Sequence, residues 1–286
     1  EDNAGYRRVM RDTLEFDPQI INRYVNFLNN PDEKTAVEQF GKSDKYFGVC
    51  AMAATLPGTP MFGHGQFEGL TEKYGMEYRR AYYNESADQG FVSHHERVIV
   101  PVLKQRRVFA GSDNFLLFDF ASDKGEVDEN VYAYTNGLGA ERGLFIFHNH
   151  KATARGRIGR SVAFARKTGQ GDEKELVTQT LAQGLALQGG ANRFVLFRDQ
   201  FTGLEYLHPS DELIEEGMHF ELGPYECHVF TGIREITDPD GRYAALAASL
   251  QGAGVPDIEE ALRMAYLQPL HSAYRALVNA HTFEAL

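Results

Sequence analysis

Apolar residues in the first 110 positions alternate between two spacings. Residues 1–22 carry them at helical intervals, whereas residues 23–28 (RYVNFL) form a short β-branched and aromatic run typical of a strand. Residues 44–56 are apolar almost all round, which predicts a helix that is buried on several sides. Residues 59–69 (TPMFGHGQFEG) resemble a second short strand that opens into a glycine-rich loop. This order of strand, helix, strand and helix predicts parallel β/α units.

The pattern changes near residue 112. Short aromatic and β-branched runs, split by Gly, Asp and Asn, continue to residue 236 and predict an antiparallel sandwich with one inserted helix at about 173–187. Within the run VYAYTN, alternation places the two tyrosines on one face of the sheet and the valine and alanine on the other. From residue 237 to residue 286 the spacing is helical again. The chain therefore divides into residues 1–111, 112–236 and 237–286.

Composition excludes several classes of function. The 286 residues include 40 acids against 29 bases, for a formal charge of −11, and no basic run is present. Nucleic acid is therefore excluded as a partner, because phosphate binding depends on Lys and Arg. No apolar run reaches the roughly 18 residues of a membrane span, so no membrane partner is expected. A neutral substrate such as a sugar fits this charge balance.

The cysteines and the N-terminus give little information about function or compartment. Cys50 and Cys227 lie far apart in apolar surroundings, which indicates two buried thiols and neither a disulfide framework nor a zinc site. No signal peptide is visible. However, the chain begins at Glu1 without a methionine, so we expect the native N-terminus to be missing. The compartment is left open, with the cytoplasm favoured.

An acidic turn follows the first predicted strand. Asn30, Pro31, Asp32 and Glu33 come directly after the run RYVNFL, and Thr35 then begins a helix through a predicted capping box. Two interpretations of the turn are open. Its acids either shape the turn before the helix, or they form a site at the end of a strand.

A second capping box, Ser93 with Glu96, predicts the start of a later helix. His94 and His95 would then be solvated at its N-terminus. The letters HNH at 148–150 match a nuclease motif, but they lie in a predicted strand of an acidic chain. We therefore interpret them as strand residues.

Three ordered motifs together resemble the α-amylase family of glycoside hydrolases. Residues 27–32 (FLNNPD) are similar to its last strand-end motif, which has an apolar pair, a variable residue and then Asn-His-Asp. Residues 56–60 (LPGTP), followed by Met61 and Gly65, are similar to its Leu-Pro-Gly-x-Pro segment before the eighth barrel strand. Residues 221–226 (ELGPYE) match a common end of its C-terminal β domain. The resemblance covers residues 1 to about 235.

The resemblance implies an α/β plus all-β fold. Residues 1–111 would be the last two β/α units of a TIM-type (β/α)8 barrel, 112–236 an antiparallel β-sandwich and 237–286 terminal helices. The chain would then be the C-terminal portion of a larger enzyme. Its partner would be the missing N-terminal part of that barrel.

The resemblance also assigns a site. Asp32 would be the acid that stabilises the transition state, while Asn30, Pro31, Glu33 and His64 would bind an α-glucan or oligosaccharide substrate. Such chemistry needs a carboxylate near an oxocarbenium-like transition state. Pro31 occupies the place of the family's histidine, and its ring cannot donate a hydrogen bond to a sugar.

Departures from the family leave three functions open. The family's nucleophile and general acid lie on its fourth and fifth strands, and no such stretch occurs here, so the chain alone is expected to be inactive. No cofactor is evident, and the resemblance places any calcium site in the missing part. We expect the parent protein to be a retaining glycosidase that acts on α-glucosidic bonds. The alternatives are a non-catalytic carbohydrate-binding or scaffold protein, to which Pro31 and the altered loop at 65–69 point, and an α-glucan transferase of the same family.

Overall fold

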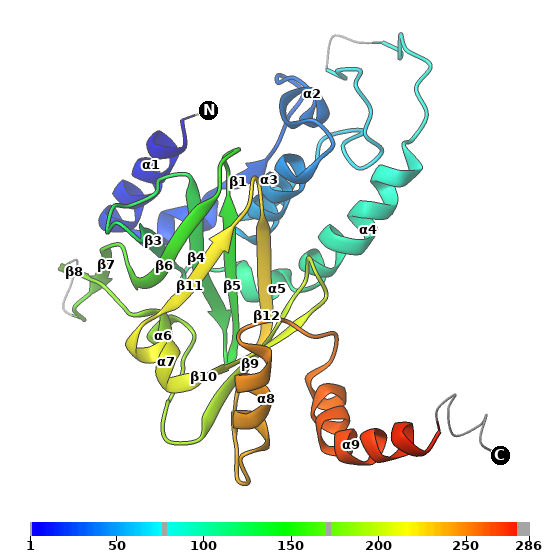
Figure 1. Ribbon diagram of the computed structural model, residues 1–286. Coiled ribbons are helices and arrows are strands. Elements are labelled where there is room, and N and C mark those ends of the chain that lie inside the picture. Colours follow the sequence, from blue (N-terminus) through cyan, green and yellow to red (C-terminus); the bar gives the residue numbers. More distant parts are fainter. Residues whose placement is uncertain (1, 76–78, 170–172, 279–286) are drawn as a thin grey trace.

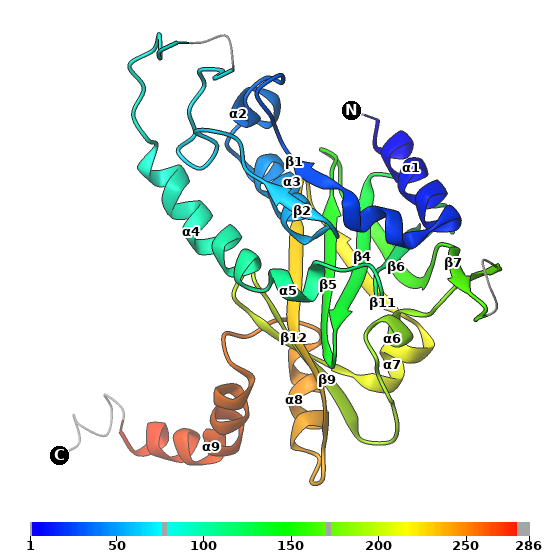
Figure 2. The ribbon, with the colours of Figure 1, turned by 180° about the vertical axis from the view of Figure 1, so that it is seen from behind.

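The computed structural model describes residues 2–75, 79–169 and 173–278. Two parts pack together, because the helices and short strands of the N-terminal third cover one face of a large antiparallel sheet (Figures 1 and 2). The first part consists of α1 (Asn3–Phe16), the 3-10 helix η1 (Pro18–Arg23), β1 (Val25–Phe27), α2 (Ala36–Phe40), α3 (Asp44–Thr55), β2 (Thr59–Met61), α4 (Gln89–Lys104) and α5 (Arg106–Phe109).

Strands β1 and β2 pair in parallel, with Val25 opposite Thr59 and Phe27 opposite Met61. Helix α3 forms the crossover between them, so the predicted β/α alternation is confirmed here. Most of the side chains of α3 are buried, as its apolar sequence predicts. The helix ends at Thr55, because Pro57 disfavours a helical conformation for Leu56, the residue before it.

The second part is one eight-stranded sheet in the order β10-β9-β12-β5-β4-β3-β6-β11, with every neighbouring pair antiparallel. Its strands are β3 (Leu116–Ser122), β4 (Val131–Leu138), β5 (Glu141–His148), β6 (Ala154–Ser161), β9 (Arg193–Asp199), β10 (Glu205–Pro209), β11 (Met218–Leu222) and β12 (Cys227–Thr237).

The sheet curls around its own core. Tyr132 and Tyr134 pack against the N-terminal part, and Val131 and Ala133 face the inside of the curl, which confirms the predicted alternation. Phe230 on the central strand β12 also meets aromatic rings of both sheet edges, in β10 and β11.

The expected antiparallel strands are present, but they are not divided between two separate sheets. Strand β12 is 11 residues long. Its first residues pair with β5 and its last residues pair with β9, with a register shift between Thr231 and Arg234. Because β12 pairs with β5 on one side and with β9 on the other, backbone hydrogen bonds join all eight strands. In a sandwich these hydrogen bonds would stop between the two sheets.

The inserted helix predicted at 173–187 is wrong for most of its length. Lys174–Val177 form the strand β8, which pairs with β7 (Phe164–Lys167) as a hairpin, and one helical turn, α6 (Leu181–Gly184), follows. Thr180 caps that turn through a complete capping box. The remaining helices are α7 (Ser210–Glu215), α8 (Arg242–Leu250) and α9 (Ile258–Leu277).

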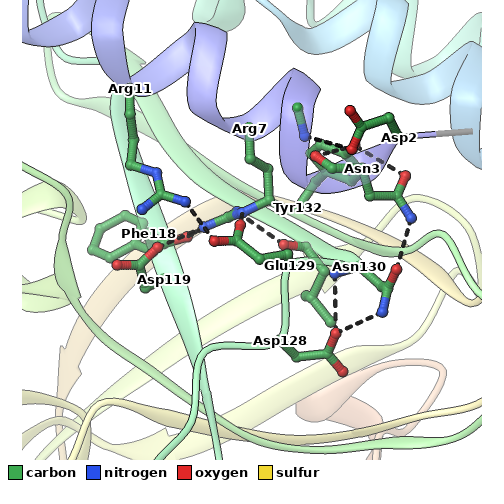
Figure 3. A network of polar contacts seen from close by, with 12 residues as sticks. Asp2, Asn3, Arg7, Arg11, Phe118, Asp119, Asp128, Glu129, Asn130 and Tyr132 are labelled. Carbon is green, nitrogen blue, oxygen red and sulfur yellow. Dashed lines mark hydrogen bonds and ion pairs between the residues drawn. The ribbon is translucent and has the colours of Figure 1, made fainter.

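A buried arginine attaches α1 to the sheet (Figure 3). The side chain of Arg7 has no exposed surface and donates to Glu129 Oε2 and Asp119 Oδ1, both at 2.6 Å. It also donates to the carbonyl oxygens of Val131, at 2.9 Å, and Phe118. Several donors of the guanidinium therefore find acceptors, which is the condition for burying this charge.

A second contact of α1 lies one turn earlier. Asn3 donates to Asn130 Oδ1 at 2.8 Å and to the carbonyl oxygen of Asn149 at 3.1 Å. Its own Oδ1 accepts from Asn149 Nδ2 and from the Tyr132 hydroxyl. Helix α1 is thus held at two points along its length, and both points lie on β4 and its neighbours (Figure 3).

We expect Arg7→Met to lower the free energy of unfolding by about 3 kcal/mol, because it leaves the half-buried Asp119 without its cation and leaves Glu129 with Arg11 alone. Arg8→Met removes an exposed arginine from the same helix and should change stability by less than about 0.5 kcal/mol. Urea unfolding of both variants measures the difference. Equal losses would show that the bonds of Arg7 do not stabilise the fold.

Candidate functional site

A cavity of about 210 Å3 lies beyond the carboxyl ends of β1 and β2. Parallel β/α proteins place their functional residues at this edge. Four of the five residues predicted from the sequence line the cavity. The complete lining is Asn29, Asn30, Pro31, Glu33, Thr35, Met61, Phe62, Gly63, His64, Lys73 and Tyr74.

Asp32, the fifth predicted residue, lies outside this lining and is exposed. The side chain of Asn30 sets its position, because Asn30 Oδ1 accepts from the backbone N–H groups of Asp32 at 2.8 Å and Glu33 at 3.0 Å. On the other side, Lys73 Nζ donates to the carbonyl oxygen of Asp32 at 2.9 Å. The turn is therefore fixed, and Asp32 lies in it between the lining residues Pro31 and Glu33 without lining the cavity itself.

The opposite wall comes from the loop after β2. The rings of His64 and Tyr74 lie 5.0 Å apart. Gly63 presses against the turn, since a Cβ atom there would come within 2.3 Å of Asn29 Nδ2. The N–H of Gly63 donates to Gln66 Oε1 at 3.0 Å, which closes the loop on itself. Turn and loop thus touch, and the cavity forms between them.

A buried histidine packs against the loop after β2. His95 Nδ1 lies 2.9 Å from the carbonyl oxygen of Phe91, to which it donates, so Nε2 is left to accept from the Tyr46 hydroxyl at 2.9 Å. The ring of Phe67, within the loop, packs 4.4 Å from the imidazole. Burial lowers the pKa of His95, which keeps the ring neutral.

The prediction that His95 is solvated at a helix start is therefore wrong. Helix α4 begins at Gln89, where the side chain of Asp88 accepts from the N–H of Phe91, so Ser93 lies inside the helix. A signal for this was present in the sequence. His95 continues the helical spacing of the buried Phe91 and Val98.

A second charged cluster, none of whose members lines the cavity, was missed by the sequence analysis. His228 donates from Nδ1 to Asp199 Oδ2 at 2.9 Å and from Nε2 to Glu226 Oε1 at 3.1 Å. Asp199 is fully buried and also accepts from the N–H groups of Phe201 and Val229. Asp199 ends one apolar strand and His228 lies in another, so neither sequence pattern indicates the pairing.

This cluster stabilises the fold and is not suited to proton transfer. Burial lowers the pKa of His228, but the hydrogen bonds and charges of Asp199 and Glu226 outweigh burial and raise it to about 9. The imidazolium therefore keeps both protons near neutral pH, and neither nitrogen is available as a base. Its effect is to join β9, β12 and the turn before β12.

His228 should make stability depend on pH. Its pKa is about 9 in the folded chain and near 6.5 when unfolded, so its stabilisation is complete below pH 6.5 and lost as the pH rises through 9. The stability difference between the wild type and His228→Gln should shrink by about 3 kcal/mol from pH 6 to pH 10. Denaturant unfolding across this range measures it. A constant difference would contradict a charged His228, and the exposed His150→Gln should change little at any pH.

Within the described part of the chain, no group of three or more His, Cys, Asp or Glu side chains is arranged to hold a metal ion. No helix in residues 2–75, 79–169 and 173–278 is both long and apolar enough to cross a membrane.

Comparison with known proteins gave matches in structure alone. No family model and no curated protein matches the sequence. Among solved structures, the α-amylase of Geobacillus thermoleovorans, solved with acarbose, is 12% identical, with 76% of this chain and 40% of that chain covered at a TM-score of 0.47. The Nostoc punctiforme debranching enzyme, soaked with acarbose, is 13% identical, with 80% and 38% covered at a TM-score of 0.46.

A third match is the trehalose-6-phosphate hydrolase of Bacillus licheniformis, 12% identical, with 78% of this chain and 46% of that chain covered at a TM-score of 0.42. The matches are α-amylase-family glycosidases, the family that the sequence motifs resemble. The chain spans about 40% of the length of these proteins. At such identities and TM-scores the likeness carries no weight for function, which has to be argued from the residues themselves.

Proposed function

We propose that the chain is the C-terminal part of an α-amylase-like glycosidase that acts on α-glucosidic bonds of glucans or oligosaccharides. The observation that carries this proposal is the convergence of Asn30, Glu33 and His64 on one cavity, from the ends of two parallel strands. Amide, carboxylate and imidazole groups hydrogen-bond to sugar hydroxyls, and the aromatic ring of Tyr74 at the wall offers an apolar face.

In this proposal Asp32 stabilises the transition state. Its backbone is fixed from both sides, by Asn30 and by Lys73, and its neighbours Pro31 and Glu33 both line the cavity. An oxocarbenium-like transition state develops positive charge, which a nearby carboxylate stabilises more than it stabilises the neutral substrate. The nucleophile and the general acid of the retaining mechanism would come from strands outside this chain.

The open edge of β1 supports the proposal that a further part of the barrel packs beside it. Within the described residues β1 pairs with β2 alone, and Val25 and Phe27 are 50% and 40% exposed. Beside them, Tyr24 and Met52 line a hollow of about 560 Å3. A parallel strand with an open edge and apolar side chains in water is a liability unless another strand covers it. The rest of the barrel would supply that strand.

We expect the 286-residue chain, purified alone, to release no reducing sugar from starch or maltooligosaccharides, because it lacks the two other acids. A reducing-sugar assay over several hours measures this. Steady turnover by a homogeneous sample would contradict the proposal that the nucleophile lies elsewhere.

In the full-length protein, Asp32→Asn should lower kcat by at least about 10²-fold, the scale for removing one preorganised electrostatic group. The melting temperature should change little, since Asp32 is exposed. Asp12→Asn, an exposed acid on α1, is the matched control and should leave kcat unchanged. Unchanged turnover in Asp32→Asn would reduce Asp32 to a turn residue, and a large loss of melting temperature would make it structural.

One observation favours a second candidate, a non-catalytic carbohydrate-binding or scaffold protein. Pro31 lines the cavity at the place where the family has histidine, and it gives up that hydrogen bond to the sugar. Sugar binding without turnover in the full-length protein would favour this candidate. An α-glucan transferase would use the same residues, so product analysis separates it from a hydrolase.

A further inference from the structure

The C-terminal helix α9 is attached to the sheet through its first turns. Ile258 and Leu262 are buried in a cluster with Leu246 of α8. The backbone N–H of Ile258 also donates to Glu205 Oε2, on β10, at 2.9 Å. From residue 263 to residue 278 no residue of the helix is buried, and both views show this part of α9 extending away from the sheet (Figures 1 and 2).

The exposed part of α9 carries an apolar stripe. Four large side chains recur there at intervals of four, four and three positions, which places them on one face of the helix. They are Tyr266, Leu270, Tyr274 and Leu277, and they are 78%, 64%, 63% and 70% exposed. Single exposed apolar residues need no explanation, but a contiguous row of them marks an interaction surface.

This part of the helix also needs a partner for its own stability. Isolated helices of up to about 15 residues are marginal in water, and most helical stability in proteins comes from the packing of an apolar face. Pro269 lies within the exposed part and removes one of its backbone hydrogen bonds. A molecule that covers the stripe would therefore stabilise the helix as well.

The order of side chains along the stripe fits a second copy of the same helix that runs in the opposite direction. The stripe alternates tyrosine and leucine, and it starts with one and ends with the other. In an antiparallel pair Tyr266 lies opposite Leu277 of the second copy, and Leu270 lies opposite its Tyr274. Each ring then packs on a leucine, and the patch is complementary to itself, as a two-fold interface requires. No acid occurs between residues 261 and 278, so the pair buries no carboxylate.

The area of the stripe is sufficient for a weak dimer. A buried tyrosine contributes 150–250 Å², so two tyrosines and two leucines at these exposures offer on the order of 500 Å² per copy. The total of about 1,000 Å² is at the lower end of specific interfaces. The rest of the barrel is less suited to cover the stripe, because it would join β1, and both views place α9 at the other end of the molecule from β1 (Figures 1 and 2).

We propose that this stripe joins two copies of the protein through an antiparallel pair of α9 helices. The proposal does not depend on the function proposed above. The dimer is two-fold symmetric, with its axis between Leu270 and Tyr274, and its small interface corresponds to a Kd in the micromolar range.

Sedimentation equilibrium of the full-length protein at about 1–200 μM should show a reversible monomer–dimer equilibrium. Leu270→Glu with Tyr274→Glu should raise the Kd at least about 100-fold, because the carboxylates would be buried at the centre of the pair. Gln268→Glu with Ser272→Glu is the matched control. It adds the same charge to the same helix, but two positions away and therefore on the opposite face, and it should leave the Kd within about twofold of the wild type.

Disulfide cross-linking tests the direction of the pair. Tyr266→Cys and Leu277→Cys each add an exposed thiol, whereas the native Cys50 and Cys227 are buried. When the two variants are mixed and oxidised, with a tag on one of them, antiparallel helices give cross-linked heterodimers and parallel helices give homodimers. The wild type, oxidised in the same way, controls for any other thiol of the full-length protein.

Three results would overturn the proposal. A wild type that stays monomeric at the highest concentration would leave the N-terminal part of the protein, or another molecule, as the cover of the stripe. A dimer that persists in the Leu270→Glu and Tyr274→Glu pair would have to form through another surface. Equal dissociation of this pair and of the control pair would show that added charge alone separates the copies.

Discussion

The position of the candidate site depends on the burial of one positive charge. Arg7 is removed from water completely, and an isolated guanidinium in that place would be strongly unfavourable. Asp119 and Glu129 therefore have to face it. Asp119 lies in β3, and Glu129 lies just before β4. The arginine fixes α1 in one orientation on β3 and β4. The chain then runs through η1 directly into β1, so the strand that leads to the cavity inherits this orientation.

Close packing of α3 fixes the position of β2 relative to the curled sheet. Helix α3, which joins β1 to β2, lies so near the sheet that a Cβ atom at Gly48 would come within 2.0 Å of the ring of Phe147. Tyr46 on the same helix reaches the buried His95, and both support the loop that carries His64. The walls of the cavity are thus built on the curled sheet, although no sheet residue lines it.

Local patterns in the sequence were sufficient for what depends on neighbouring residues. They predicted the β/α alternation, the buried α3 and the opposite faces of Tyr132 and Val131, because each follows from a spacing of two or about four positions. They failed where distant segments meet. The continuous sheet follows from the pairing of β12 with two strands, and the His228 cluster joins residues 29 positions apart. In the site, Asn30, Pro31, Glu33 and His64 line one cavity, whereas Asp32 lies outside the lining, in a turn that the side chain of Asn30 holds.

The separation of Arg7 from its partners along the chain also affects how the protein is made. Asp119 and Glu129 lie 112 and 122 positions after it, so neither exists when α1 leaves the ribosome. Until then the helix carries an arginine without acceptors and has no sheet to cover its apolar face. The contacts of Arg7 therefore have to wait for β3 and β4, and they form only through a long-range pairing along the chain. During that interval the guanidinium of Arg7 stays in water, and it is buried only when the sheet forms.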